Sequence, residues 1–433
     1  MSGRTQSRAA LLALCAAAAI CAGCKRQPKA EAPAEAKAQG PAQAASVAGP
    51  ASAPPQQPAQ PAAMAAKPID AAEALRDRKK ALAPPASPCL DNSVAEPPLP
   101  DLLEQAARDF EKARYAQALQ CGREATRLDQ GNVAAHHFRG AALAELGLID
   151  EARTAYARAL ALDPDDPEVL RSVADLYVRR LGGRDDLELA LQYVRRALPR
   201  AQKGRDPILQ KELHLLAAMA LDDLGRPAAA LEESGRATEL DPKDREARRE
   251  KGVSLFELCR FDQARAELLG LVAEEPDAWA EHYLGLIAER AHDEAAALAH
   301  FSRAEALDPD AFRPQPALPG ETFSQVIKEE SERLPPEARH GLAQAELQVQ
   351  ELPEVADLVA TDPPLSPGIL GLFRPPPEGS KADRKPAIIL YRRNLARAAR
   401  SVEDLRREVR DTLLHEVGHL NGEDDEQLRD RGL

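Results

Sequence analysis

Aromatic residues are scarce in this 433-residue chain, which contains one Trp and only 3% Phe, Trp and Tyr together. Sandwiches and barrels of β-strands are built from aromatic and β-branched residues, so this scarcity disfavours both classes. The body of the chain is rich in Ala and Leu instead, which favours a helical architecture. Because the length exceeds that of one ordinary domain, we expect two domains and a tail.

An excess of positive charge is also missing. The chain has 57 Lys and Arg against 70 Asp and Glu, and its formal net charge is −13. Binding of nucleic-acid phosphates requires a concentrated basic surface, and no segment supplies one. This balance argues against a nucleic-acid partner.

Long apolar runs are absent except for residues 9–22, which follow Arg4 and Arg8. This is the layout of a secretory signal, and the run is too short to span a bilayer stably. Its end, Cys21-Ala-Gly-Cys24, resembles a bacterial lipoprotein box. The resemblance implies a signal over 1–24, acylation of Cys24, and a lipid-anchored, extracytoplasmic protein of the bacterial envelope. Secretion without a lipid and an uncleaved anchor are the alternatives.

Cysteine is rare beyond Cys24, where only Cys89, Cys121 and Cys259 remain. An odd number at unrelated spacings predicts neither a disulfide framework nor a second zinc site, although one bridge between Cys89 and Cys121 stays open. Residues 25–98 consist largely of Ala, Pro and Gln and offer few side chains to bury. Ordering them would cost more entropy than burial could recover, so we expect a disordered linker.

From residue 99 the chain repeats itself with a 34-residue period, which places Ala118 in register with Ala152, and Ala230 with Ala264. The pattern resembles tetratricopeptide (TPR) repeats over 99–310. The resemblance implies an α-solenoid of about six helix pairs, with small residues where paired helices cross. The units are expected to begin near Leu99, Val133, Pro167, Lys211, Arg245 and Ala278.

A TPR array implies an adaptor that binds an extended protein segment in its concave groove. Ordinary packing or solvent exposure is the alternative for each candidate side chain in that groove. Trp279 is expected to pack between repeats rather than to bind a ligand. The candidate groove residues are His137, Arg249, Phe256 and His282.

Near the C-terminus, His415-Glu416-x-x-His419 runs on into Gly422 and Asp425. On a helix the two histidines lie one turn apart on one face, so both imidazoles can meet one zinc ion. Glu416 beside that face is placed to act as a general base without ligating the metal. Gly422 permits a left-handed turn that returns Asp425 to the metal as a third ligand. An exposed amphipathic helix with surface histidines is the alternative.

Ser401 and the apolar spacing that follows it predict that this motif lies on a properly started helix. Upstream we expect a helix over 322–334, strands at 347–349 with 355–359 and at 387–391, and a loop over a cleft between them.

Together these motifs resemble the bacterial minimal zincin-like metallopeptidase family over residues 318–433. The resemblance implies a small α+β domain, zinc held by His415, His419 and Asp425, and Glu416 as the catalytic base. No methionine follows Met219, so the Met-turn of metzincins is absent.

The sequence therefore predicts a membrane-anchored zinc metallopeptidase, a hydrolase whose TPR array recruits a protein or peptide. Three protein ligands leave a coordination position open, whereas structural zinc sites are closed by four. A non-catalytic TPR scaffold, or an envelope assembly factor with a degenerate peptidase domain, is the alternative.

Overall fold

The computed structural model describes residues 89, 97–312, 320–376 and 385–433. The predicted signal, Cys24 and nearly all of the predicted linker lie outside the described residues. Among the residues that are described, no helix is both long and apolar enough to cross a membrane.

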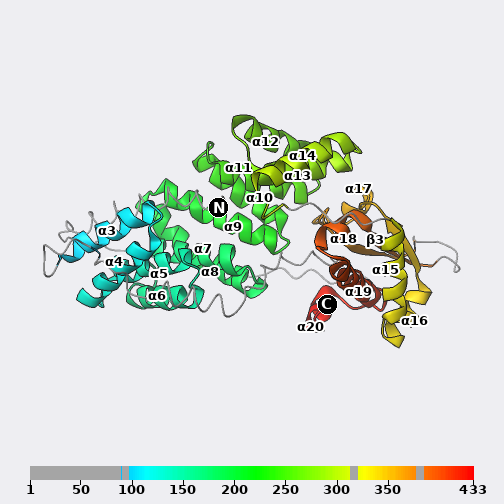
Figure 1. The fold of residues 1–433 in the computed structure, drawn as a ribbon, viewed down its shortest axis with the longest axis horizontal. Helices are drawn as coiled ribbons and strands as arrows, with labels where there is room; N and C mark the ends of the chain where they lie inside the picture. Colours follow the sequence, from blue (N-terminus) through cyan, green and yellow to red (C-terminus); the bar gives the residue numbers. More distant parts are fainter. Residues whose placement is uncertain (1–88, 90–96, 313–319, 377–384) are drawn as a thin grey trace, which may run out of the picture.

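Residues 97–312 form six antiparallel helix pairs (Figure 1). Five of the six expected starts coincide with the first residue of a helix, whereas α9 begins four residues before Lys211 because Asp206 caps it and Pro207 occupies its first position. The first helices of the pairs are α3 (Leu99–Glu111), α5 (Val133–Glu145), α7 (Pro167–Leu176), α9 (Pro207–Asp223), α11 (Arg245–Glu257) and α13 (Ala278–Arg290). The second helices are α4 (Tyr115–Leu128), α6 (Ile149–Leu162), α8 (Arg184–Gly204), α10 (Pro227–Leu240), α12 (Phe261–Glu274) and α14 (Glu294–Leu307).

Two local features set the geometry of each pair. Asp or Asn precedes most first helices, and its side chain accepts a hydrogen bond from a backbone N–H of the first turn, as Asn132 does for Ala135. Where the two helices cross, a glycine lets them approach. A Cβ atom added to Gly140 would lie 2.6 Å from the Tyr156 ring. The small-residue positions expected from the repeat pattern are therefore sites of close contact.

The third unit departs from the repeat. Its first helix continues into a π-helical turn, η1 (Tyr177–Leu181), which ends at Gly182 with φ of 70°. Turns of this kind often accompany functional sites in other proteins. Here the turn carries Arg179 and Arg180, which line a groove described below.

A disulfide joins Cys89 to Cys121, which is the one bridge that the sequence left open. Cys121 is fully buried on α4, and Cys89 packs near Leu102 at the start of the array. The odd number of cysteines carried no information about this proximity, because Cys89 and Cys121 are 32 residues apart and meet only in the folded chain.

The C-terminal domain contains a three-stranded sheet in the order β1-β3-β2. Strand β3 is central and buried along its length, with β1 parallel and β2 antiparallel to it. The strands are β1 (Glu346–Gln350), β2 (Gly371–Arg374) and β3 (Ala387–Tyr391), and the helices are α15 (Gly320–Arg333), α16 (Pro336–Gln344), α17 (Val355–Leu358), α18 (Arg392–Ala398), α19 (Val402–Leu420) and α20 (Asp425–Asp430).

Both faces of the sheet are covered. Ile388 and Leu390 pack in one core with α15 and α19, and Ile389 and Tyr391 pack in a second core on the other face. Two expectations were wrong here. Residues 355–358 form one helical turn rather than a strand, and 371–374, expected to be loop, form the edge strand β2.

Candidate metal centre

Helix α19 carries the histidine motif and is built as its sequence predicts. Ser401 caps it by accepting a hydrogen bond from the backbone N–H of Asp404. His415, Glu416 and His419 are all buried on the face that turns toward the domain interior. They lie in the last turns of the helix, beside the short helix α20 (Figure 1).

The turn after α19 brings the chain back to this face. Gly422 has φ of 87°, the left-handed conformation that glycine tolerates best, as the sequence predicts. Asp424 then caps α20 in a reciprocal pair of hydrogen bonds with Gln427. Asp425 is the first residue of α20, and its carboxylate points back toward the two histidines.

Three candidate donor atoms converge at this point. The Nε2 atoms of His415 and His419 are 3.0 Å apart, and Oδ1 of Asp425 lies 3.4 Å from the first and 3.3 Å from the second. One ligand atom from each of the three residues lies within 4.8 Å of the other two. Two imidazole nitrogens and a carboxylate oxygen are a donor set that zinc prefers.

The backbone assigns the tautomer of one histidine. Nδ1 of His419 is 3.0 Å from the carbonyl oxygen of Glu423, which can only accept a hydrogen bond. Nδ1 of the neutral ring therefore carries the proton, and Nε2 presents its lone pair to His415 and Asp425. A carbonyl that orients a histidine in this way is a usual support for a metal ligand, so these residues fit a zinc ion.

Charge is balanced between Asp425 and the histidines. Burial acts to raise the pKa of Asp425, but the two imidazoles beside it outweigh burial and hold that pKa below its usual range. The pKa of His419 is raised, because Asp425 and Glu416 together outweigh the lowering effect of burial.

Glu416 is fully buried between α19 and β2. Neither of its carboxylate oxygens makes a well-formed hydrogen bond to another described residue. Burial raises its pKa to about 7, although His419 and the backbone N–H of Phe373 act in the opposite direction. A Cβ atom added to Gly371 would lie 3.1 Å from the Glu416 side chain and 2.5 Å from Thr412, so glycine is needed for this close approach.

Strand β2 presents backbone groups to Glu416. The carbonyl oxygen of Leu370 accepts a hydrogen bond from the N–H of Tyr391 in β3. Because hydrogen-bonded and non-hydrogen-bonded positions alternate in an antiparallel pair, the backbone groups of Gly371 and Phe373 point away from β3. They therefore lie along the side of β2 that Glu416 occupies.

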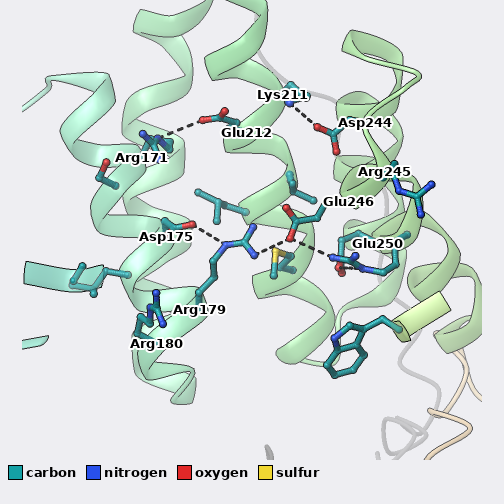
Figure 2. A pocket seen from close by; sticks show the side chains of 18 of the residues that line it. Arg171, Asp175, Arg179, Arg180, Lys211, Glu212, Asp244, Arg245, Glu246 and Glu250 are labelled. Atoms are coloured by element: carbon teal, nitrogen blue, oxygen red, sulfur yellow. Dashed lines mark hydrogen bonds and ion pairs between the residues drawn. The ribbon is translucent and has the colours of Figure 1, made fainter. Parts of the chain in front are cut away.

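A second concave feature lies within the TPR array, where a groove of about 790 Å³ runs along the first helices of the repeats. Figure 2 shows its charged lining, in which Arg179 bridges Asp175 and Glu246. His137 and Arg249 line this groove, as expected. His137 is buried and hydrogen-bonds to Ser172, and Arg249 pairs with Asp277 at 3.0 Å.

Two other groove candidates do not line it. Phe256 is buried in the core between α11 and α13, because its side chain faces the partner helices rather than the groove. His282 stacks on Phe312 with ring centroids 4.8 Å apart. Trp279, expected to pack between repeats, lines the groove and is 43% exposed.

Most of the groove lining was missed, although the sequence contains a signal for it. The side chains that face the groove recur at the 34-residue period of the first helices. Arg171 corresponds to His137, Trp279 to Arg245, and Tyr283 to Arg249. Projecting one known groove position through the repeat would have found its equivalents in neighbouring units.

Together, the fold and the site define a helical repeat protein with a C-terminal domain of metallopeptidase type. Residues 342–433 match the family model described as zincin-like metallopeptidase, and residues 133–176 and 221–290 match tetratricopeptide repeat models. The chain thus carries TPR repeats followed by a zincin-like metallopeptidase domain.

Several solved structures resemble the repeat region. A pilF protein of Pseudomonas aeruginosa is 18% identical, with a TM-score of 0.42, and the match covers 49% of this chain and 92% of that one. YrrB, described as a TPR protein with an unusual peptide-binding site, is 22% identical with a TM-score of 0.35, and the match covers 45% and 95% of the two chains. PilW, described as a type IV pilus biogenesis factor, is 18% identical with a TM-score of 0.43, and the match covers 49% and 94%. No curated protein matches the chain.

Proposed function

We propose that the protein is a zinc-dependent peptidase whose TPR array recruits its substrate or a partner. The observation that carries the proposal is the convergence of donor atoms from His415, His419 and Asp425 beside the buried carboxylate of Glu416. Three protein donors leave a zinc coordination position open, which favours a catalytic site over a structural one.

A zinc ion held by these three residues would supply the Lewis acidity that activates water and polarises a peptide carbonyl. Glu416 is the residue placed to accept the proton of the attacking water at its carboxylate, because it neighbours the first histidine and neither of its oxygens makes a well-formed hydrogen bond to another described residue. His419 is held in its ligating orientation by the Glu423 carbonyl. Asp425 contributes the negative charge that balances the site.

The substrate class follows from β2. Backbone groups of Gly371 and Phe373 face the side of the strand on which Glu416 lies. An extended peptide can pair with such groups as an added strand, which would place its backbone carbonyls near the base. We therefore infer an unfolded or extended polypeptide as the substrate.

The test compares the parent protein with Glu416→Gln, which keeps the shape of the side chain and removes the base. Zinc content and cleavage of an unfolded protein are measured for both. We expect similar zinc content and a loss of turnover of roughly 10²-fold or more in the variant. Equal cleavage by both proteins would remove the assignment of Glu416. A folded domain that takes up no zinc would favour the non-catalytic scaffold.

The charge of the groove suggests what the TPR array recruits. Eleven carboxylate side chains and six cationic ones line it, and each of the six cations already has a carboxylate partner within 4.0 Å. Asp222 and Asp223 have no such cationic partner among the described residues, and burial raises the pKa of both, an effect that a cationic side chain placed beside them would oppose. We infer that the groove favours extended segments that carry Lys or Arg.

Fluorescence anisotropy with two labelled peptides of equal length, one rich in Lys and one rich in Glu, tests this preference. The Lys-rich peptide should bind more tightly, and Asp222→Asn with Asp223→Asn should weaken it several-fold, roughly. Equal binding of both peptides, or tighter binding of the acidic one, would contradict the inference.

We also propose that the folded part lies outside the cytoplasm and is anchored through an acylated Cys24. The Cys89–Cys121 disulfide supports an oxidising compartment. Labelling of cells with a fatty-acid analogue tests the anchor, because Cys24→Ser should abolish labelling. Persistent labelling of that variant would overturn the assignment.

A further inference from the structure

The TPR array and the C-terminal domain contact each other at several points, and one of them is a short segment, residues 365–369, which leads directly into β2. Several contacts from the last repeats and from α18 meet on this segment. Together they connect the repeats to Glu416.

The first contact is an ion-pair network under α13. Glu289 is only 7% exposed, and its carboxylate accepts hydrogen bonds from Arg393 at 2.8 Å and from Arg397 at 2.6 Å. Both arginines belong to α18, which separates β3 from the metal-binding helix α19. Arg397 is itself largely buried, with its side chain 16% exposed. A buried pair of this kind is costly to break, because either partner alone would be left without compensation.

The network continues from Arg397 to the segment. Arg397 donates a second hydrogen bond, at 2.8 Å, to Oδ1 of Asn394. The amide nitrogen of Asn394 donates to the carbonyl oxygens of Pro367 at 3.0 Å and Ile369 at 2.7 Å. Because the guanidinium can only donate and the carbonyls can only accept, the amide has one orientation that satisfies all three contacts. Asn394 is 5% exposed, so water does not readily replace them.

A second set of contacts comes from the end of α11. Burial raises the pKa of Glu257, and the Ser366 hydroxyl beside it acts in the opposite direction. Cys259 lies 3.7 Å from the carbonyl oxygen of Leu365 and packs against the core that contains Leu365 and Ile369. The same five-residue segment is therefore held by α11 on one side and by the network under α13 on the other.

The segment determines where β2 lies. Leu370, the next residue, pairs with Tyr391 of β3, and Gly371 then begins β2 within close contact of Glu416. Only Leu370 separates Ile369 from Gly371, so the backbone has little conformational freedom there. A shift of the segment would move the backbone of Gly371 and Phe373 relative to the Glu416 carboxylate.

We propose that the last two TPR repeats form part of the C-terminal site, with Glu289, Arg397 and Asn394 as positioning residues that hold β2 against Glu416. The catalytic consequence rests on the proposed peptidase function, but the placement of β2 does not. The repeats thus serve the site directly, in addition to any recruitment in their groove.

Asn394→Asp separates positioning from simple docking of the two domains. The variant keeps the size of the side chain and gains an ion pair with Arg397, so the domains stay in contact. It loses both donated hydrogen bonds to Pro367 and Ile369, because a carboxylate cannot donate. Arg397→Gln is the second variant, since it removes the link to Glu289.

Glu294→Gln is the matched control. Glu294 also bonds Arg393 across the interface, at 2.8 Å and 3.0 Å, but its side chain is 62% exposed and it reaches Asn394 only indirectly, through Arg393, Glu289 and Arg397. It therefore reports what weakening the interface does without disturbing Asn394.

The readouts on the full chain are hydrogen exchange of peptides covering 370–374, zinc content, and the separate values of kcat and KM. Asn394→Asp and Arg397→Gln should speed exchange at 370–374 by roughly tenfold or more, with zinc content and the exchange of α15 unchanged. Glu294→Gln should leave 370–374 as in the parent. If the parent cleaves polypeptide, kcat should fall in the first two variants only.

Unchanged exchange at 370–374 in Asn394→Asp would overturn the proposal. An equal increase in the exchange rate at 370–374 in Glu294→Gln would show that the network only holds the two domains together and does not position β2. If the parent protein cleaves no polypeptide, the proposed peptidase function is wrong. The hydrogen-exchange result still tests whether the network positions β2.

Discussion

At the scale of single residues, the candidate metal centre depends on groups other than its three candidate donors. The Glu423 carbonyl selects the ligating nitrogen of His419, and Asp424 starts the helix that carries Asp425. The spacing of the motif was enough to predict that His415, His419 and Asp425 come together, with Glu416 beside them. It did not reveal these supporting roles, since backbone carbonyls and helix caps leave no distinctive residue pattern.

The groove candidates were predicted less well. His137 and Arg249 line the groove, whereas Phe256 lies in the core and His282 stacks on Phe312. Residues on one helix that are close in sequence can face opposite sides, and residue type does not distinguish a packing ring from an exposed one. The face of each helix is set by its partner helix.

The buried His137 should make the array sensitive to acid. Burial lowers its pKa to about 3, with Arg171 acting in the same direction, from an ordinary value of 6.5. Below pH 6.5 the unfolded chain binds a proton that the folded chain does not, so stability present above that pH is lost as pH falls toward 3. At pH 5 this loss is about 2 kcal/mol.

Denaturant unfolding of the parent and of His137→Gln at pH 7 and pH 5 measures the effect. The fall in the free energy of unfolding between the two pH values should be about 2 kcal/mol smaller in the variant. An equal fall in both proteins would show that His137 does not titrate as its burial implies. His282 is present in both proteins and cancels in the comparison.

At the scale of elements, the approach of α20 to α19 determines whether Asp425 reaches the histidines. Leu428 of α20 is fully buried, and its side chain would collide with a Cβ atom added to Gly418 on α19. The glycine in the motif therefore has a packing role between the two helices. Its absence would displace α20 and the carboxylate at its first position.

Gly418→Ala should weaken zinc binding while α19 stays helical, because alanine favours the helix and only the α20 contact is lost. Gly235→Ala is the control, since an added Cβ in α10 meets nothing within 4 Å. Competition with a zinc chelator, together with circular dichroism, checks both variants. Parent-like zinc affinity in Gly418→Ala would contradict the packing role.

The elements were predictable to different degrees. Repeated helices were located by their period, and the structure shows that capping residues such as Asn132 and Asp244 begin them. Strand β2 was missed because its four residues, beginning with glycine, have little intrinsic preference for a strand and become one by pairing with β3. The turn α17 was mistaken for a strand because Val355 and Val359 imitate a β pattern.

At the scale of the whole molecule, single helices of the TPR array serve both the groove and the contact with the C-terminal domain. Helix α11 supplies Arg249 to the groove, and Glu257 at its end lies beside segment 365–369. Helix α13 supplies Tyr283 to the groove and Glu289 to the ion-pair network with α18. No sequence pattern predicted this arrangement, because Arg393 and Glu289 are 104 residues apart and pair only in the folded chain. The order of the domains could be predicted from the sequence, but the contact between them could not.

The central claim is that the chain holds zinc through His415, His419 and Asp425. Asp425→Ala removes a donor, and Asp424→Asn is its matched control. Asparagine caps a helix about as well as aspartate, so the control removes the neighbouring charge and keeps α20 in place. Alanine at position 424 would be a poorer control, because it would also remove the cap.

The most direct measurement is the zinc dissociation constant of the full chain and of these two variants, by titration against a chelator of known affinity. Asp425→Ala should bind zinc at least 10- to 100-fold more weakly, roughly, because loss of even a supporting group around a metal ligand costs that much. Asp424→Asn should bind zinc like the parent protein. Parent-like affinity in Asp425→Ala would contradict the account and leave His415 and His419 as the only ligands that the motif supports.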